Sequence, residues 1–114
     1  MEKYVGIPYK ELDCWGLVKK FYAEEYKIIL KSYYDKPPMD KDISKDIAYS
    51  GMADFTQVEF PMHGDIVLIK ILGVPCHVGV YLEGNKLLHT REKSGSVIDR
   101  FNKWSKMVEG YYRL

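Results

Sequence analysis

The chain has 114 residues, enough for one hydrophobic core but with little room for a second, so we expect a single domain over residues 1–114. Hydrophobic residues make up 46% of it and charged residues 29%, which excludes the low hydrophobicity typical of disordered chains. Because 17 basic residues nearly balance 16 acidic ones, the charge favours neither a nucleic-acid partner nor an anionic membrane surface.

The first residues lack the charged and apolar regions of a signal peptide, and no window approaches the roughly 18 apolar residues of a membrane span. We therefore expect a protein that is synthesised in the cytoplasm without a signal peptide and has no membrane partner. If its target lies outside the cell, another route must deliver it, such as release or association with a virion. The two cysteines, Cys14 and Cys76, are too few for a disulfide framework.

Residues 1–12 have the Gly and Pro punctuation of a loop, and the first helix is expected from Cys14 to about Leu30. The apolar residues that recur there at helical spacing are Leu17, Val18, Phe21 and Tyr22. Asp13 is of a type common at helix N-caps, which places Cys14 in the first turn. Unpaired backbone N–H groups and the positive end of the helix dipole surround a thiol there, so we expect its thiolate to be favoured.

Residues 31–63 are harder to interpret, because two consecutive prolines at 37 and 38 interrupt the chain and no long apolar pattern follows them. Short polar runs with scattered apolar residues favour two short helices, over residues 40–49 and 52–58. No internal repeat is visible in this part or elsewhere.

From Gly64 onward, short β-branched and apolar runs alternate with turn residues. These runs predict strands over residues 65–72, 77–82, 86–90, 96–98 and 108–113. Asp99 is expected to cap a short helix that continues through Trp104. A helix followed by an antiparallel meander of about five strands predicts an α+β domain rather than a parallel βαβ fold.

Two of the three histidines, His77 and His89, lie on neighbouring strands that we expect to form a hairpin. Because side chains alternate between the two faces of a strand, the length of the turn decides whether these histidines share a face. A two-residue turn at 84–85 places them on opposite faces, and a three-residue turn at 83–85 places them on one face. We favour the three-residue turn, because it sets Gly79 opposite His89 and leaves open space beside His77.

Together with Cys14, these histidines supply the parts of a mechanism based on a cysteine nucleophile. His77 is the expected base, which takes the thiol proton and later protonates the leaving amine, and His89 orients it through a hydrogen bond. The backbone N–H of Cys14, at a helix N-terminus, is the expected oxyanion donor.

Cys76 directly precedes His77, so strand alternation predicts that it points to the opposite face, away from the site, as a small buried residue. A metal site built from Cys76, His77 and Cys14 is not expected, because these residues lack the spacing of known ligand motifs. The mechanism also requires no cofactor.

Four segments, in the order GIPY, DCWGLV, GDIVL and HVGVYLEGNKLLHT, resemble the NlpC-type cell-wall cysteine peptidases, which have a papain-like fold. In that family the third polar residue follows the catalytic histidine by twelve positions, as His89 follows His77. Trp15 in DCWGLV and the ending GYYRL are most similar to the branch found in bacteriophage tail proteins. The resemblance covers about residues 4–113.

This resemblance implies a thiol endopeptidase that cuts peptidoglycan stem or crosslink peptides, commonly at the bond between γ-D-glutamyl and the diamino acid. Position by position, Cys14 matches the nucleophile, His77 the base and His89 the orienting residue. Tyr9, in GIPY, matches a tyrosine that lines the site near the nucleophile. The resemblance also implies a phage or prophage protein of the tail or of lysis, with peptidoglycan peptides as substrate and other phage tail proteins as partners.

The chain departs from the family pattern at His63, which stands where the family usually has Pro in a turn, so we interpret His63 as a surface residue without a catalytic part. The loop between GIPY and the cysteine is also shorter than usual. Two alternatives stay open for the function. The same fold can be a structural or assembly module of a phage tail with vestigial catalysis, or a Cys-His acyltransferase or amidase that acts on another substrate.

Overall fold

The computed structural model describes residues 1–30 and 55–114 of the chain. Its elements in chain order are the 3-10 turn η1 (Glu2–Tyr4), the helix α1 (Cys14–Tyr26), the strands β1 (Thr56–Val58), β2 (Ile66–Ile71), β3 (Val74–Leu82), β4 (Lys86–Arg91) and β5 (Gly95–Arg100), the 3-10 turns η2 (Phe101–Lys103) and η3 (Ser105–Met107), and the strand β6 (Val108–Arg113). No helix in these two described ranges has the length and apolar character to span a membrane.

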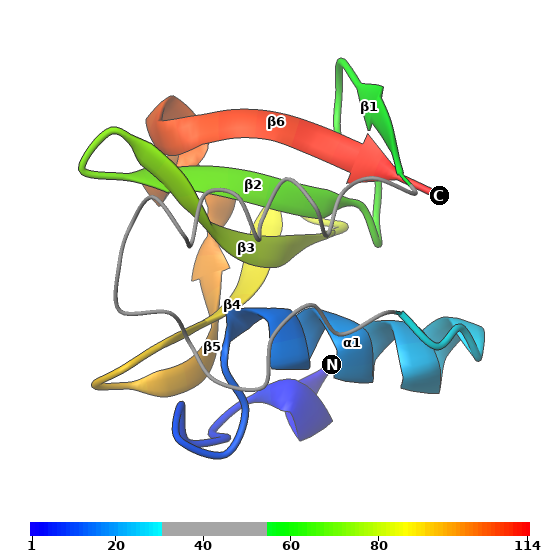
Figure 1. Ribbon diagram of the computed structural model, residues 1–114, viewed down its shortest axis with the longest axis vertical. Coiled ribbons are helices and arrows are strands. Elements are labelled where there is room, and N and C mark those ends of the chain that lie inside the picture. Colours follow the sequence, from blue (N-terminus) through cyan, green and yellow to red (C-terminus); the bar gives the residue numbers. More distant parts are fainter. Residues whose placement is uncertain (31–54) are drawn as a thin grey trace.

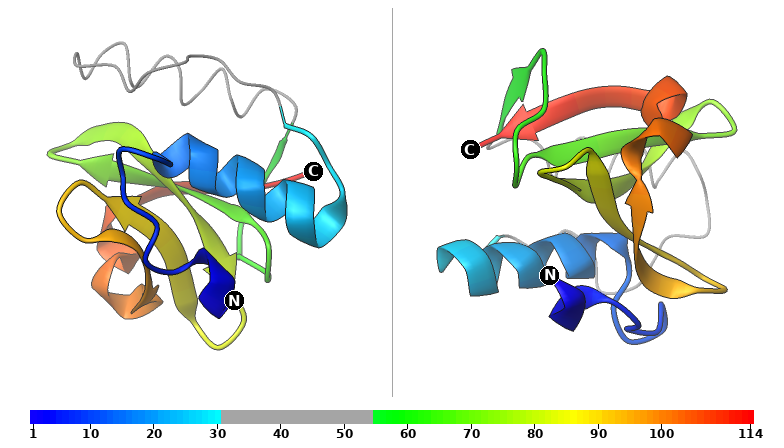
Figure 2. Two further views of the ribbon diagram at one scale, coloured as in Figure 1. Left: turned by 90° about the horizontal axis from the view of Figure 1, so that it is seen from below. Right: turned by 180° about the vertical axis from the view of Figure 1, so that it is seen from behind.

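The described strands form one antiparallel sheet of six strands in the order β1-β6-β2-β3-β4-β5. Helix α1 lies along one side of this sheet (Figure 1). Two further views show that the sheet bends, so that β4 and β5 leave the plane of β2 and β6 and approach the N-terminal end of α1 (Figure 2). The α+β prediction is confirmed, with one strand more than expected.

The helix begins where the sequence predicts, because the Asp13 carboxylate accepts a hydrogen bond from the backbone N–H of Gly16 at 2.8 Å. It ends earlier than predicted, at Tyr26. Lys27 adopts a left-handed conformation with φ of 59° and closes the helix, and the apolar side chain of Ile29 beyond it is 83% exposed.

Alternating side chains of the sheet enter two apolar clusters. The cluster that faces α1 includes Leu17, Val18 and Phe21 of the helix and Ile66, Leu68, Val78, Val80 and Leu88 of the sheet. The cluster on the other face is built from Val67, Ile69, Leu87, Phe101 and Trp104. This division of β2 between two clusters explains the unbroken apolar run of its first four residues, 66–69, because both faces are buried there.

Three expectations from the sequence differ from the structure. Thr56–Val58 is an edge strand that pairs with the end of β6, where a helix over residues 52–58 was expected. Asp99 lies within β5 and caps no helix, since the 3-10 turn η2 that follows has Arg100 at its N-cap. The strand expected from His77 begins earlier, at Val74. The helix expected over residues 40–49 lies outside the described residues.

An ion pair ties the start of β2 to the end of β6. The guanidinium of Arg113 donates two hydrogen bonds to the carboxylate of Asp65, at 2.9 Å from Nε and 2.6 Å from Nη2. Asp65 also accepts the backbone N–H of Met62 and is only 3% exposed. A buried carboxylate of this kind needs its partners, because an unpaired charge loses its hydration without compensation.

Replacement of this arginine tests the ion pair. We expect Arg113→Ala to lower the free energy of unfolding by about 2–3 kcal/mol, because it leaves the buried Asp65 charge unpaired. The matched control is Lys70→Ala, which removes an exposed pair with Glu109 at 3.7 Å and is expected to cost less than about 0.5 kcal/mol. Urea denaturation of both variants measures the difference, and equal losses would contradict the role given to this pair.

Candidate active site

The hairpin of β3 and β4 has the three-residue turn that brings the two histidines together. Leu82 pairs with Lys86 and Val80 with Leu88, so the turn consists of residues 83–85. Gly84 and Asn85 adopt left-handed conformations with φ of 84° and 59° and reverse the chain within this turn. The register preferred from the sequence is therefore confirmed, and both histidines lie on the same face of the sheet.

Gly79 makes room for this arrangement. A Cβ atom built on Gly79 would lie 2.8 Å from the carbonyl oxygen of Leu88 and 3.1 Å from the Cβ of His89. A side chain at this position would push β4 away from β3, so the backbones approach this closely only because residue 79 is a glycine.

Beyond this glycine the two strands part. The β3–β4 ladder begins at Val80, whereas β3 continues back to Val74 along β2 and β4 continues forward to Arg91 along β5. A pocket of about 690 Å³ lies at this opening, lined by Cys14, Cys76, His77 and Thr90 among others. The N-terminal end of α1, which carries Cys14, therefore lies at the part of the sheet where β3 is no longer paired with β4 (Figure 1).

Cys76 lies in this pocket, and the prediction that it points away is wrong. Ile69 pairs with His77 and Lys70 with Pro75, which leaves Cys76 as an extra residue in a β-bulge on β3. A bulge interrupts the strict alternation of faces, so Cys76 and the adjacent His77 both line the pocket. Strand alternation read from the sequence cannot detect such an insertion.

Cys14 is 7% exposed and occupies the first position of α1. Burial raises the pKa of this thiol to about 11, and the adjacent Asp13 carboxylate adds to the rise. Hydrogen bonds from the backbone N–H groups of Val78 and Trp15 lower the pKa by less. The expected preference for thiolate is therefore wrong in direction, because the loss of hydration outweighs the effect of the helix N-terminus.

His77, which lines the pocket, begins a chain of hydrogen bonds between side chains. Its Nε2 lies 3.0 Å from Nδ1 of His89, and Nε2 of His89 lies 2.7 Å from Oδ2 of Asp99. The indole N–H of Trp104 donates to the same carboxylate oxygen at 3.1 Å. His89 is completely buried, and the Trp104 ring packs edge-on against it at 4.6 Å between centroids.

Both histidines are neutral at physiological pH. Burial lowers the pKa of His77 to about 3, with the neighbouring charges at His89 and Arg91 as smaller causes. Burial also lowers the pKa of His89, although the hydrogen bond to Asp99 acts in the opposite direction. For Asp99, burial raises the pKa, but hydrogen bonds from His89 and Trp104 more than compensate, so its pKa is below the usual value and it is ionised.

These charge states determine where each ring carries its proton. An ionised Asp99 only accepts, so Nε2 of His89 carries a proton and its Nδ1 accepts. Nε2 of His77 must then donate to that Nδ1. A neutral His77 ring has one proton, which leaves its Nδ1 with a free lone pair that can accept the proton of a thiol.

Sequence reasoning missed Asp99 and Trp104 as parts of this chain. Asp99 was expected to cap a helix, but it continues β5, where His89 pairs with Val97. Asp99 follows Val97 by two residues and therefore shares the face of His89. The turn of β4 and β5 again contains three residues, because Arg91 pairs with Gly95. Pairing the residues of the β4–β5 hairpin across a three-residue turn, as was done for β3 and β4, would have identified Asp99 as a neighbour of His89.

The structure places the other candidate residues as follows. Tyr9 lines the pocket together with Cys14, and burial raises its pKa to about 12. His63 is exposed, does not line the pocket, and accepts the backbone N–H of Glu83 at 3.0 Å through Nδ1. Within residues 1–30 and 55–114, no group of three or more potential ligands could hold a metal ion.

Fold and site together define an α+β domain in which a cysteine at a helix start and a histidine of the sheet, His77, line the same pocket. The chain belongs to the NlpC/P60 family, which it matches over residues 3–113. The crystal structure of the NlpC/p60 domain of the peptidoglycan hydrolase SagA has the same fold, with a TM-score of 0.69 at 15% identity over 98% of this chain and 91% of that one. The papain-like fold expected from the resemblance is thus confirmed.

Two relatives extend this comparison. The murein DD-endopeptidase MepS/murein LD-carboxypeptidase of Escherichia coli is 28% identical over 104 residues, which cover 89% of this chain and 48% of the relative. The tail tip assembly protein K of Escherichia phage N15 is 32% identical over 84 residues, which cover 68% of this chain and 34% of the relative. The chain therefore spans about half or less of the length of these proteins.

The raised thiol pKa predicts how Cys14 reacts. Because iodoacetamide alkylates thiolate, we expect the alkylation rate of Cys14 to rise about tenfold per pH unit from pH 7 to pH 10, without a plateau. Mass spectrometry of the digested protein measures Cys14 separately from Cys76. The same protein unfolded in urea is the control, in which the rate levels off near the ordinary thiol pKa. A plateau below pH 8 in the folded protein would show a thiolate–imidazolium pair instead.

Proposed function

We propose that this domain is a cysteine peptidase that hydrolyses peptidoglycan stem or crosslink peptides, with Cys14 as nucleophile, His77 as base and His89 as the residue that orients the base. The hydrogen-bonded chain from His77 through His89 to Asp99 carries this proposal. It fixes a neutral imidazole beside the pocket that contains the thiol, which is the arrangement that thiol catalysis needs. Membership of the NlpC/P60 family supports the substrate class.

In the proposed mechanism the thiol proton passes to Nδ1 of His77 as the sulfur attacks the carbonyl carbon of the scissile peptide. The resting pair is neutral, so the proton transfer accompanies the attack. The oxyanion that forms is bound by the backbone N–H of Cys14, with the hydroxyl of Tyr9 at the pocket wall as a second donor. His77 then protonates the leaving amine, and it later activates the water that hydrolyses the thioester.

The finer assignment follows from the family resemblance. We propose the bond between γ-D-glutamyl and the diamino acid as the one cleaved, and a phage or prophage tail or lysis protein as the setting. The similarity to the tail tip assembly protein K supports this setting and a second function, in which the domain takes part in tail assembly with other tail proteins. Synthesis in the cytoplasm and delivery as part of a virion, or by release, fit both functions.

Digestion of purified stem peptides and crosslinked muropeptides, with mass spectrometry of the products, tests the peptidase function. We expect Cys14→Ser and His77→Gln each to lower kcat/KM at least about 10³-fold while the fold persists, since the nucleophile and the base act as one unit. His63→Gln is the matched control, because this histidine lies outside the pocket, and it is expected to retain activity.

The other outcomes of this assay separate the alternatives. Full turnover by Cys14→Ser would contradict the mechanism. No cleavage of any peptide, with an acyl-enzyme formed on Cys14 from a thioester donor, would favour an acyltransferase. No reaction of either kind would favour the assembly function.

Asp99 is proposed as a positioning residue that sets the tautomers of both histidines. Asp99→Asn introduces an amide that can donate to Nε2 of His89, so both rings are expected to change tautomer and kcat to fall about 10²-fold with little change in KM. Nitrogen-15 NMR shifts of the two rings report the tautomers directly. Trp104→Phe is the control, because it removes the other hydrogen bond of Asp99 but leaves an acceptor for His89. Unchanged ring shifts in Asp99→Asn would contradict this role.

A further inference from the structure

The N-terminal segment is attached to the sheet at one residue of β5, Ser96. The backbone N–H of Gly6 donates to the Ser96 carbonyl at 2.8 Å, and the Ser96 N–H donates to the carbonyl of Ile7 at 2.9 Å. The side chain adds a third bond, because Oγ of Ser96 accepts the N–H of Ile7 at 2.8 Å. Ser96 is 1% exposed, so little water reaches its hydroxyl to compete for this bond.

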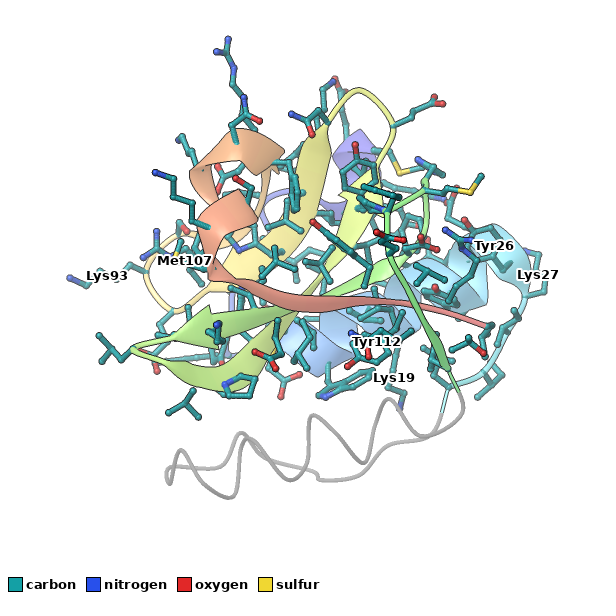
Figure 3. All side chains as sticks on the ribbon, turned by 90° about the horizontal axis from the view of Figure 1, so that it is seen from above. Lys19, Tyr26, Lys27, Lys93, Met107 and Tyr112 are labelled. Carbon is teal, nitrogen blue, oxygen red and sulfur yellow. The ribbon has the colours of Figure 1, made fainter. Side chains whose placement is uncertain are left out.

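Gly95, directly before Ser96, allows the two segments to approach this closely. A Cβ atom built on Gly95 would lie 2.6 Å from the carbonyl oxygen of Ile7, closer than such atoms approach in real structures. Gly95 also has a left-handed backbone, with φ of 71°, where the turn between β4 and β5 ends. That turn projects from the body of the domain with Lys93 extending outward (Figure 3). The N-terminal segment is therefore attached where β5 leaves the turn.

Tyr9 follows this attachment by two residues and lines the pocket together with Cys14. Pro8 lies between them, and its fixed φ leaves the chain little freedom at that point. On the other side of Tyr9, the carbonyl of Pro8 accepts the N–H groups of Glu11 and Leu12 at 3.0 and 3.1 Å and closes a turn before α1. These two attachments flank Tyr9 and determine where its side chain joins the pocket wall.

We propose that Ser96 and Gly95 form a clamp on residues 6–7 and act as positioning residues, which hold the Tyr9 hydroxyl where the oxyanion forms. The proposal rests on the proposed peptidase function, in which Tyr9 is the second oxyanion donor. Neither clamp residue lines the pocket, so both act through the N-terminal segment. An oxyanion donor works within about 3 Å of the developing charge, so a small displacement of its backbone removes its effect.

The first test needs no peptide and uses the full chain. Amide hydrogen exchange followed by NMR reports whether the Ser96 hydroxyl holds the Ile7 N–H. We expect Ser96→Ala to raise the exchange rate of Ile7 at least about tenfold, with a smaller change at Gly6, whose acceptor is the backbone carbonyl.

Tyr22→Phe is the matched control for this test. It also removes a buried hydrogen bond, from the Tyr22 hydroxyl to the carbonyl of Gly64, so a general loss of stability affects both variants. We expect exchange at Ile7 to stay unchanged in Tyr22→Phe. Equal exchange rates at Ile7 in the wild type and in Ser96→Ala would overturn the clamp.

The second test displaces the segment by one methyl group. Gly95→Ala places a Cβ against the Ile7 carbonyl oxygen and adds the strain of a left-handed alanine. Gly73→Ala is the matched control, since Gly73 has a similar φ of 79° but nothing lies within 4 Å of its added Cβ. Thermal denaturation is expected to show a loss of stability in both variants. Only Gly95→Ala is expected to lower kcat for stem-peptide cleavage, about tenfold with little change in KM. Equal kcat values in the two variants would overturn the positioning role.

A double-mutant cycle shows whether the clamp acts through Tyr9. The hydroxyl is absent in Tyr9→Phe, so Gly95→Ala is expected to lower kcat less than about twofold in that background. A further tenfold loss, about the same as in the wild type, would show that the clamp only supports the local fold and would overturn its role. Ser96→Ala, taken through the same cycle, decides the question if Gly95→Ala does not fold.

Failure of the clamp and failure of the peptidase function are distinguishable. If the wild type cleaves no stem peptide, the proposed function fails and the positioning role fails with it, while exchange at Ile7 still decides whether Ser96 holds the N-terminal segment. If the peptides are cleaved and Tyr9→Phe loses activity but neither clamp variant does, the peptidase function stands and the positioning role is wrong.

Discussion

The hydrogen bond between His77 and His89, 3.0 Å long, is the interaction on which the site depends. It exists because the β3–β4 turn has three residues and because Gly79 lets the strands approach closely. A turn shorter by one residue would place the two rings on opposite faces of the sheet, with no way to meet. Asp99 extends the bond through a partly buried, ionised carboxylate and decides which nitrogen of each ring carries a proton. The geometry of two successive hairpins, β3–β4 and β4–β5, thus sets the protonation pattern beside the pocket.

Burial has two consequences that must be considered together. It keeps both histidines neutral, which leaves His77 with a lone pair for the thiol proton, and it keeps Cys14 as a thiol rather than a thiolate. The helix N-terminus and two backbone N–H groups favour the thiolate but do not overcome the loss of hydration. In the proposed mechanism, such a site stores its nucleophile in a protonated form and relies on the base when a substrate arrives.

Membership of the NlpC/P60 family connects this hairpin and helix to a wider group of domains. MepS is described as a murein peptidase and protein K as a tail tip assembly protein, and the chain spans 48% and 34% of their lengths. The turn between β4 and β5, residues 92–94, forms part of the pocket wall. Turns of this type can vary without disturbing the sheet, so specificity can change there while the hydrogen-bonded chain remains.

The sequence alone determined the helix start at Asp13, the antiparallel order of the later strands and the face shared by the two histidines, because local capping and strand alternation govern these features. It could not determine the position of Cys76, since a β-bulge breaks the alternation, nor the part played by Asp99, which depends on how far β5 continues beside β4. The sequence also could not determine the protonation state of Cys14. Capping is a local effect that a sequence displays, whereas burial of the sulfur results from the packing of α1 against the sheet, and only the tertiary structure decides which of the two is larger.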